Sequence, residues 1–187
     1  MDCCEGLKQL YDDCIDMMIT SPPYDAIRDY KKGFDFDIKT LCKELYRVCK
    51  MGAVVVWVVG DGYIKGNDGW KTESLSSLKQ ALSFTFAGFN CHQTMIYGKK
   101  MIPISAVSQV RYYNRFEYMF VFSKGRPKTI NLIHDRKNTW QNQKWDSINV
   151  RTKSGEQKKL KDGDEIKKIN EFGVRDNVWA YPTGFDH

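Results

Sequence analysis

Four residues near the start of the chain have types and spacing that suit chemistry on an amine. They are Ser21, Pro22, Pro23 and Tyr24, here called the SPPY segment. A serine hydroxyl can accept a hydrogen bond, and the carbonyl between two prolines is a second acceptor whose direction is fixed by restricted φ angles. Acceptors on both N–H groups of a conjugated amine favour a pyramidal nitrogen whose lone pair points at an electrophile. A neighbouring tyrosine can stack on an extruded base. The segment is therefore a candidate for activating an exocyclic base amine, and the competing interpretation is a turn that only ends a strand.

The SPPY segment directly follows Ile15–Thr20, a short and nearly continuous apolar run. Two prolines cannot continue a helix or a central strand, so the run is predicted to be a buried parallel strand that opens into a loop. In open α/β sheets, ligands bind outside the carboxyl ends of the strands. The segment therefore lies where a catalytic loop is expected.

The rest of the first 125 residues alternates between helix and strand patterns. Apolar periodicity predicts helices over Glu5–Leu10, Asp37–Lys50 and Ser74–Ala87, and strands over Ala53–Val59, Cys91–Tyr97 and Tyr118–Phe122. In the third helix the apolar face consists of Leu75, Leu78, Leu82 and Phe86. This order is typical of an open α/β sheet with helices on both faces.

The net charge of +6 is distributed unevenly. The segment Lys124–Arg175 holds fourteen Lys and Arg against seven Asp and Glu, whereas the remainder holds fifteen against sixteen. The apolar rhythm fades after Gly125, and Arg126–Gly173 is polar, basic and predicted to be loop-like. A basic lobe on a neutral body suits a polyanion such as nucleic acid, with a lysine-rich solvated surface as the alternative. Two regions are predicted, residues 1–125 and the basic residues 126–187.

The six cysteines form no C-x-x-C pair and no cluster with His at zinc spacing. No secretory signal precedes them, so we interpret them as reduced thiols of a cytosolic protein and expect no metal site. The longest apolar run, Ala53–Val59, is far too short to span a membrane.

Several blocks of the sequence, in this order, resemble the beta-type DNA amino-methyltransferases, which use S-adenosylmethionine to methylate N4 of cytosine or N6 of adenine. The resemblance extends over most of residues 1–124. Its blocks are Asp2–Leu7, Asp16–Tyr24, Leu45–Ala53, Gly88–Phe89, Ile96–Tyr97 and Phe116–Gly125. In the third block, Cys49 and Ala53 depart from the family's R-V-L-K-x-G-G pattern.

The resemblance implies a partial Rossmann-like methyltransferase sheet, the catalytic half, joined to a loop-rich basic target-recognition lobe. The SPPY segment would then hold the target base. Asp2 would lie at the edge of the adenosine pocket, with a helix cap as an almost equal alternative. Asp61 would line the substrate cleft or, more simply, form an Asp-Gly turn.

The basic lobe is predicted to contact double-stranded DNA, mainly at its phosphates. The candidate contacts are Arg126, Lys128, Arg136, Lys137 and Lys144. We expect Trp140 and Trp145 to form a small core of this lobe, with stacking on DNA as the alternative.

The family's glycine-rich cofactor loop, D-P-F-x-G-S-G-T, does not occur in these 187 residues. We therefore expect a fragment or one half of a split enzyme, completed by a C-terminal continuation or a second polypeptide that carries the loop. Without that part, Ile15–Thr20 would be an exposed apolar edge, and the chain alone would bind S-adenosylmethionine weakly or not at all.

The serine before Pro-Pro-Tyr favours cytosine N4 over adenine N6 by resemblance, and adenine N6 stays the alternative. The resemblance also implies a cytoplasmic enzyme of a bacterium, an archaeon or a phage, with a restriction endonuclease as a possible counterpart. Two further alternatives stay open. One is a DNA-binding remnant without catalysis, and the other is methylation of RNA or of protein amides.

Overall fold

The computed structural model of the chain describes residues 3–22, 37–100, 111–142, 149–159 and 169–182. The chain divides into two compact units. Unit 1 consists of Met1–Ile130 and Asn177–His187, and unit 2 consists of Asn131–Asp176. The predicted division at residue 125, into a catalytic half and a target-recognition region, concerns function and stays a prediction.

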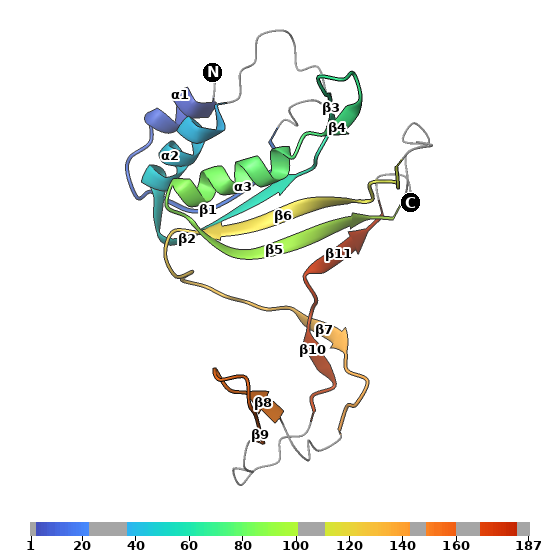
Figure 1. The fold of residues 1–187 in the computed structure, drawn as a ribbon. Helices are drawn as coiled ribbons and strands as arrows, with labels where there is room; N and C mark the ends of the chain where they lie inside the picture. The colour runs from blue at the N-terminus through green and yellow to red at the C-terminus, as the bar shows by residue number, and fades with distance from the viewer. Residues whose placement is uncertain (1–2, 23–36, 101–110, 143–148, 160–168, 183–187) are drawn as a thin grey trace. The chain divides into compact units, whose positions relative to one another are not determined.

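Unit 1 is built on a five-stranded sheet with the order β1-β2-β6-β5-β11 (Figure 1). Its strands are β1 (Ile15–Thr20), β2 (Cys49–Val59), β5 (Asn90–Lys99), β6 (Phe116–Ser123) and β11 (Val178–Tyr181). β1 is parallel to β2 and β11 is parallel to β5, while β6 lies antiparallel between β2 and β5. The predicted α/β class is confirmed, and β11 adds a strand that the sequence pattern did not predict.

The outermost described strand on one side is β1, which pairs with β2 from Ile15↔Cys49 to Thr20↔Trp57. Its parallel direction agrees with the prediction. Its burial does not, because Met17 and Ile19 are exposed. Successive side chains of a strand point to opposite faces of the sheet, and in the described part of unit 1 helices cover only one face (Figure 1). Met18 packs against the core on that face, and Met17 and Ile19 point to the other.

Three helices lie along one face of the sheet: α1 (Cys3–Lys8), α2 (Ile38–Val48) and α3 (Ser76–Phe86) (Figure 1). Asp37 caps α2, accepting hydrogen bonds at 3.1 Å from the backbone N–H groups of Lys39 and Thr40. Helices were expected on both faces, but in the described part of unit 1 they cover one.

Short antiparallel ribbons complete the described structure. In unit 1, β3 (Tyr63–Lys65) pairs with β4 (Lys71–Glu73). In unit 2, β7 (His134–Lys137) pairs with β10 (Phe172–Val174), and β8 (Asn149–Arg151) pairs with β9 (Gln157–Lys159). The prediction of loops throughout Arg126–Gly173 was therefore wrong. These strands are only three or four residues long and their described side chains are mostly exposed, so no apolar alternation marks them in the sequence.

The orientation of α3 is the opposite of the one that its apolar pattern favours. Leu75, Leu78, Leu82 and Phe86 are all exposed, and Phe86 keeps 85% of its surface. The buried positions on this helix are Ser76, Ser77, Gln80 and Phe84.

Polar contacts explain this orientation. The Trp57 indole N–H donates to Gln80 Oε1 at 2.8 Å inside the core, and Asp61 binds Ser77 at the start of the helix. Phe84, on the same buried face, belongs to the hydrophobic core and packs against the rings of Trp57 and Phe122. The buried face of α3 thus carries polar side chains that find partners on other elements, while its leucine face is exposed. Among the described residues, only Gln80 Nε2 is a buried side-chain nitrogen or oxygen without a partner.

The cysteines of α2 and β2 are core residues. Cys42 and Cys49 are fully buried, and burial raises the pKa of their thiols to about 12 and about 11, respectively. The side chain of Cys49 therefore fills an apolar position, which fits its replacement of leucine in the R-V-L-K pattern. Cys3, Cys14 and Cys91 are exposed.

We expect a thiol reagent at pH 8 to modify Cys3, Cys14 and Cys91 in the native chain and to leave Cys42 and Cys49 unmodified. The reacting species is the thiolate, and a raised pKa keeps the two buried thiols protonated while packing blocks access. Peptide mass mapping before and after denaturation measures this. Native modification of Cys42 at the rate of Cys91 would contradict the described core.

Candidate active site

The SPPY segment begins at the carboxyl end of β1, as predicted. Thr20 ends the strand, Ser21 is exposed and Pro22 is buried. The rest of the segment, Pro23 and Tyr24, lies outside the described residues, as do Asp2 and Lys144.

Several strand ends meet at the edge of the sheet that carries Ser21. Because β1, β2, β5 and β11 all run in the same direction, their carboxyl ends lie at this edge. We call it the carboxyl edge. Directly after β2 the chain turns through Gly60–Gly62 into the β3–β4 ribbon. The structure thus places the first half of the SPPY segment where α/β folds bind ligands.

A cavity of about 410 Å³ lies beside Ser21 and Pro22. Its walls are mainly apolar and come from α1, α2, β1 and β2, with Leu7, Leu41 and Trp57 among them. The hydroxyl groups of Ser21 and Thr20 belong to its lining, and no charged side chain of the described residues does. Its size is that of a small-molecule site, and its chemistry suits a flat, uncharged group that meets hydroxyls at one end.

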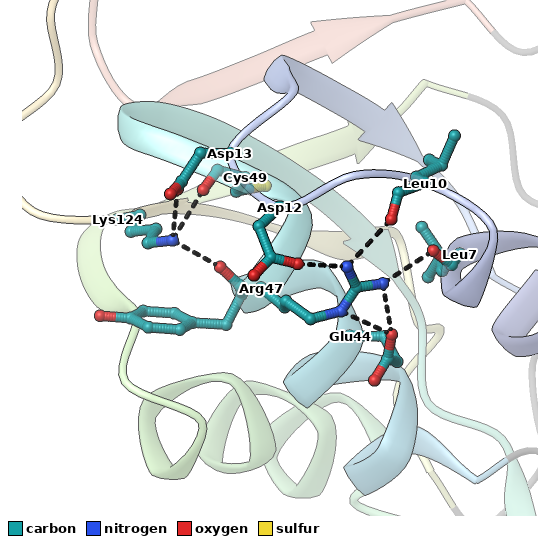
Figure 2. Close-up of polar contacts among 9 residues, drawn as sticks. Leu7, Leu10, Asp12, Asp13, Glu44, Arg47, Cys49 and Lys124 are labelled. Carbon is teal, nitrogen blue, oxygen red and sulfur yellow. Dashed lines mark hydrogen bonds and ion pairs between the residues drawn. The ribbon is translucent and has the colours of Figure 1, made fainter.

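Arg47, near the end of α2, binds the segment that leads into β1 (Figure 2). Its guanidinium donates to the carbonyls of Leu7 and Leu10, at 2.9 Å each, and so satisfies the end of α1. It also pairs with Asp12 at 2.5 Å and with Glu44 at 2.8 Å. One side chain therefore ties α1 and the following turn to α2.

Lys124, just after β6, binds the same segment from the other side (Figure 2). The residue is only 9% exposed. Its ammonium donates to Asp13 Oδ1 at 2.9 Å and to the carbonyls of Tyr46 and Cys49 at 2.8 Å each. It lies 4.8 Å from the centre of the Tyr46 ring, a cation–π contact.

Together Arg47 and Lys124, here called the β1 clasp, fix where β1 begins. Backbone bonds support them, because Asp13 donates to the Arg47 carbonyl at 3.1 Å and Cys14 donates to the Val48 carbonyl at 2.8 Å. The entry to β1 sets its pairing with β2, and that pairing sets the position of Ser21 at the opposite end of the strand. Sequence reasoning missed this role. Both residues lie in blocks that carried the family resemblance, but they were assigned no function.

Asp61 serves α3. Its carboxylate accepts hydrogen bonds from the backbone N–H of Ser77 at 2.9 Å and from the Ser77 hydroxyl at 2.5 Å, with the Ser74 hydroxyl at 3.4 Å. Neither interpretation of Asp61 described this contact with the start of α3. Asp61 also lines a small cavity with Glu73 and Glu117, and its place in a substrate cleft stays a prediction.

The described DNA-contact candidates are divided between the two units. Arg126 and Lys128 belong to unit 1, whereas Arg136 and Lys137 lie on β7 of unit 2, and all four are exposed. Exposed cations suit phosphate contacts, so their DNA role stays a prediction.

Trp140, expected in a core, is 63% exposed. That expectation was wrong for Trp140, and Trp145 lies outside the described residues.

Among the described residues, no three His, Cys, Asp or Glu side chains are arranged to hold a metal ion. No helix in the described ranges has the length and apolarity to cross a membrane.

Comparisons with known proteins agree with the sequence resemblance. The DNA methylase family of N6/N4 methyltransferases matches residues 15–183. The orphan methyltransferase M.BamHII of Bacillus amyloliquefaciens is 48% identical over an alignment of 184 residues that covers 95% of this chain and 64% of the relative. The chain therefore spans less than two thirds of that relative's length.

Two solved structures share the fold. The cytosine-N4-specific PvuII DNA methyltransferase is similar with a TM-score of 0.61 and 15% identity, over 100% of this chain and 57% of that one. A protein of Thermus thermophilus, titled a DNA modification methylase and solved with S-adenosyl-L-methionine, has a TM-score of 0.53 and 21% identity over 70% of this chain and 53% of that one.

Proposed function

Because the chain belongs to the DNA methylase family of N6/N4 methyltransferases, we propose that it carries the base-holding half of a DNA amino-methyltransferase. The observation that supports this most directly is Ser21, exposed at the carboxyl edge of the sheet and next to an apolar cavity. A base extruded from the duplex would present its exocyclic amine to the SPPY segment.

The proposed chemistry needs two acceptors and no covalent intermediate. The Ser21 hydroxyl accepts one N–H of the amine, and the carbonyl of Pro22 accepts the other. The nitrogen lone pair is then free to attack the methyl group of a sulfonium donor. A C–N bond would form as the S–CH3 bond breaks, and the electron pair of that bond would stay on sulfur, which leaves as a neutral thioether. The proton that the amine loses afterwards passes to water, which has access because Ser21 is exposed.

S-adenosylmethionine is the proposed methyl donor, and its sulfonium supplies an electrophilic methyl group. The described residues fit it only in part. The cavity beside Ser21 offers apolar walls and hydroxyls for a flat ring, but among the described residues its lining has no charged side chain for an amino-acid end. We therefore assign the described residues to holding the base.

Cytosine N4 is the proposed target, with adenine N6 as the alternative. The support is the serine at the first position of the SPPY segment, which the family resemblance associates with cytosine. Double-stranded DNA is the proposed partner, held by the exposed cations of both units at its phosphates.

The function is tested by assembling the two halves of the enzyme. The 187-residue chain is mixed with duplex DNA and S-adenosylmethionine, alone and with the part of the Bacillus relative that it does not match, supplied as a second polypeptide. We expect N4-methylcytosine in nuclease digests only when both polypeptides are present. N6-methyladenine alone would overturn the choice of base. DNA binding without methylation in the mixture would favour a non-catalytic DNA-binding protein.

In that assay, Ser21→Ala is expected to lower kcat by roughly ten- to a hundred-fold, because one of two preorganised acceptors on the amine is lost. The KM for DNA should change little, since a single hydroxyl contributes little to a phosphate-dominated interface. Ser83→Ala is the matched control, because the Ser83 hydroxyl is exposed and bonds only locally to the Lys79 carbonyl. Equal kcat values for Ser21→Ala and Ser83→Ala would contradict the assignment of Ser21.

A further inference from the structure

The β3–β4 hairpin is an ordered surface element at the carboxyl edge that the proposed function does not use. It pairs Tyr63 with Glu73 and Lys65 with Lys71, separately from the main sheet. Its turn is closed by the N–H of Gly66, which donates to the Trp70 carbonyl at 2.7 Å. Every residue of both strands is exposed, so the hairpin contributes nothing to the core. Two-stranded hairpins are marginal by themselves, and this one needs a further source of order.

That source is an arginine from a distant part of the chain. The guanidinium carbon of Arg111 lies 5.1 Å from the centre of the Tyr63 ring and 5.6 Å from that of the Trp70 ring. Arg111 also donates a hydrogen bond to the Lys71 carbonyl. The two aromatic side chains are thereby held on the hairpin, yet Trp70 keeps 55% of its surface exposed.

Positive charge exceeds negative charge around these rings, although on the hairpin itself the two lysines are matched by Asp68 and Glu73. The excess comes from Arg111, Lys100 and Arg115. Lys65 and Lys71 flank them on the hairpin, and Lys100 and Arg115 lie at the same sheet edge, where β5 ends and β6 begins. Two of the nearby carboxylates have partners, and a third, Glu73, is exposed opposite Tyr63. Asp68 accepts the N–H of Trp70 at 2.9 Å, and Glu117 pairs with Lys99 at 2.5 Å.

Exposed aromatic rings among Lys and Arg are the combination that binds nucleic acid without reading its sequence. Bases stack on the rings, and the cations meet the phosphates. A guanidinium packed on the rings adds cation–π attraction and keeps them oriented. Tyr63, Ile64 and Trp70 also form an exposed apolar patch of the kind that protein partners cover. Nucleic acid is favoured here by the excess of Lys and Arg and by the sheet edge that the hairpin shares with Ser21.

The hairpin is at the right edge of the sheet to reach the same DNA as Ser21. β2 is parallel to β1, and the hairpin follows the carboxyl end of β2 just as the SPPY segment follows that of β1. Figure 1 shows β3 and β4 beyond that end of the sheet. We infer that the hairpin is a second DNA-contacting element, in which Trp70 stacks on a base or sugar near the extruded nucleotide and Arg111 holds Trp70 in place. This inference rests on the proposed function for its choice of partner.

Trp70→Ala tests the inference by fluorescence anisotropy of the chain with a labelled duplex that contains one mismatched cytosine. We expect the Kd for the duplex to rise about five-fold or more, because the variant loses the stacking of one base on the Trp70 ring. The dependence of log Kd on log salt should keep its slope, because no charge is removed. Phe86→Ala is the matched control, an exposed aromatic on α3, and should leave Kd unchanged.

The double variant Lys65→Gln, Lys71→Gln should change the salt dependence instead. We expect the slope of log Kd against log salt to fall by about two, because each lost phosphate contact lowers it by about 0.9. Trp70→Phe should restore most of the affinity, which separates stacking from a folding defect. If Trp70→Ala leaves the Kd for DNA unchanged, the inference is wrong. A hairpin that binds a protein and not DNA would give this same result.

The two proposals fail separately. If the assembled enzyme methylates DNA while Trp70→Ala binds as the unaltered chain does, the inference is wrong and the function stands. If nothing is methylated but Trp70→Ala loses DNA affinity, the inference stands and the function is wrong.

Discussion

Phe84→Ala is expected to lower the free energy of unfolding by about 3–5 kcal/mol, whereas Phe86→Ala, two residues along the same helix, is expected to change it by less than about 0.5 kcal/mol. Phe84 has no exposed surface, and Phe86 keeps 85% of its own. Both variants remove the same atoms from the same helix, so the difference between them measures burial alone.

The size of the expected loss follows from the aromatic cluster around Phe84. Its ring stacks on Phe122 with centres 4.4 Å apart, and meets the edges of Trp57 and Phe89 at 4.9 and 5.5 Å. Alanine would leave a cavity enclosed by two rings of the sheet and by Phe89, which lies between α3 and β5, and such rigid walls relax little.

Urea unfolding followed by circular dichroism measures both variants. A larger loss for Phe86→Ala than for Phe84→Ala would show that α3 buries its leucine face, as its apolar pattern favours, and would contradict the described core.

The orientation of α3 shows where sequence reasoning ends. Periodicity predicted a helix within two residues of its observed bounds, because spacing alone decides that a helix forms. The buried face depends on single partners, Asp61 for Ser77 and Trp57 for Gln80, which come from other elements. No pattern within the helix contains that information.

In the candidate site, too, some features could be predicted from the sequence and others could not. The position of Ser21 followed from an apolar run that ends at two prolines, a local signal that the structure reproduces. The β1 clasp did not follow, because Arg47 and Lys124 read in sequence as surface cations. Their role becomes visible only when the backbone carbonyls that they bind are placed around them, those of Leu7, Leu10, Tyr46 and Cys49. The sequence did not single out Trp70 for a related reason. The guanidinium that packs on its ring belongs to Arg111, which is far away along the chain.

Lys124→Met is expected to destabilise unit 1 by about 2–4 kcal/mol. Methionine keeps the length and the apolar stem of the side chain but donates no hydrogen bond. The carbonyls of Tyr46 and Cys49 would lose the ammonium that now lies 2.8 Å from each, and an unpaired buried acceptor costs about 1–3 kcal/mol. The cation–π contact with the Tyr46 ring is lost as well.

Two further variants separate the carbonyls from the ion pair. Asp13→Asn should cost less than about 1 kcal/mol, because the side chain of Asp13 is 61% exposed and water screens its pair with Lys124. Lys43→Met, at an exposed position of α2, controls for the loss of one positive charge and should have almost no effect. Urea unfolding ranks the three. If Asp13→Asn is as damaging as Lys124→Met, the ion pair holds this side of the β1 clasp. If Lys124→Met lowers the free energy of unfolding most, the hydrogen bonds to the carbonyls of Tyr46 and Cys49 stabilise this side of the β1 clasp. Lys124 then fixes the start of β1 by donating hydrogen bonds to the backbone.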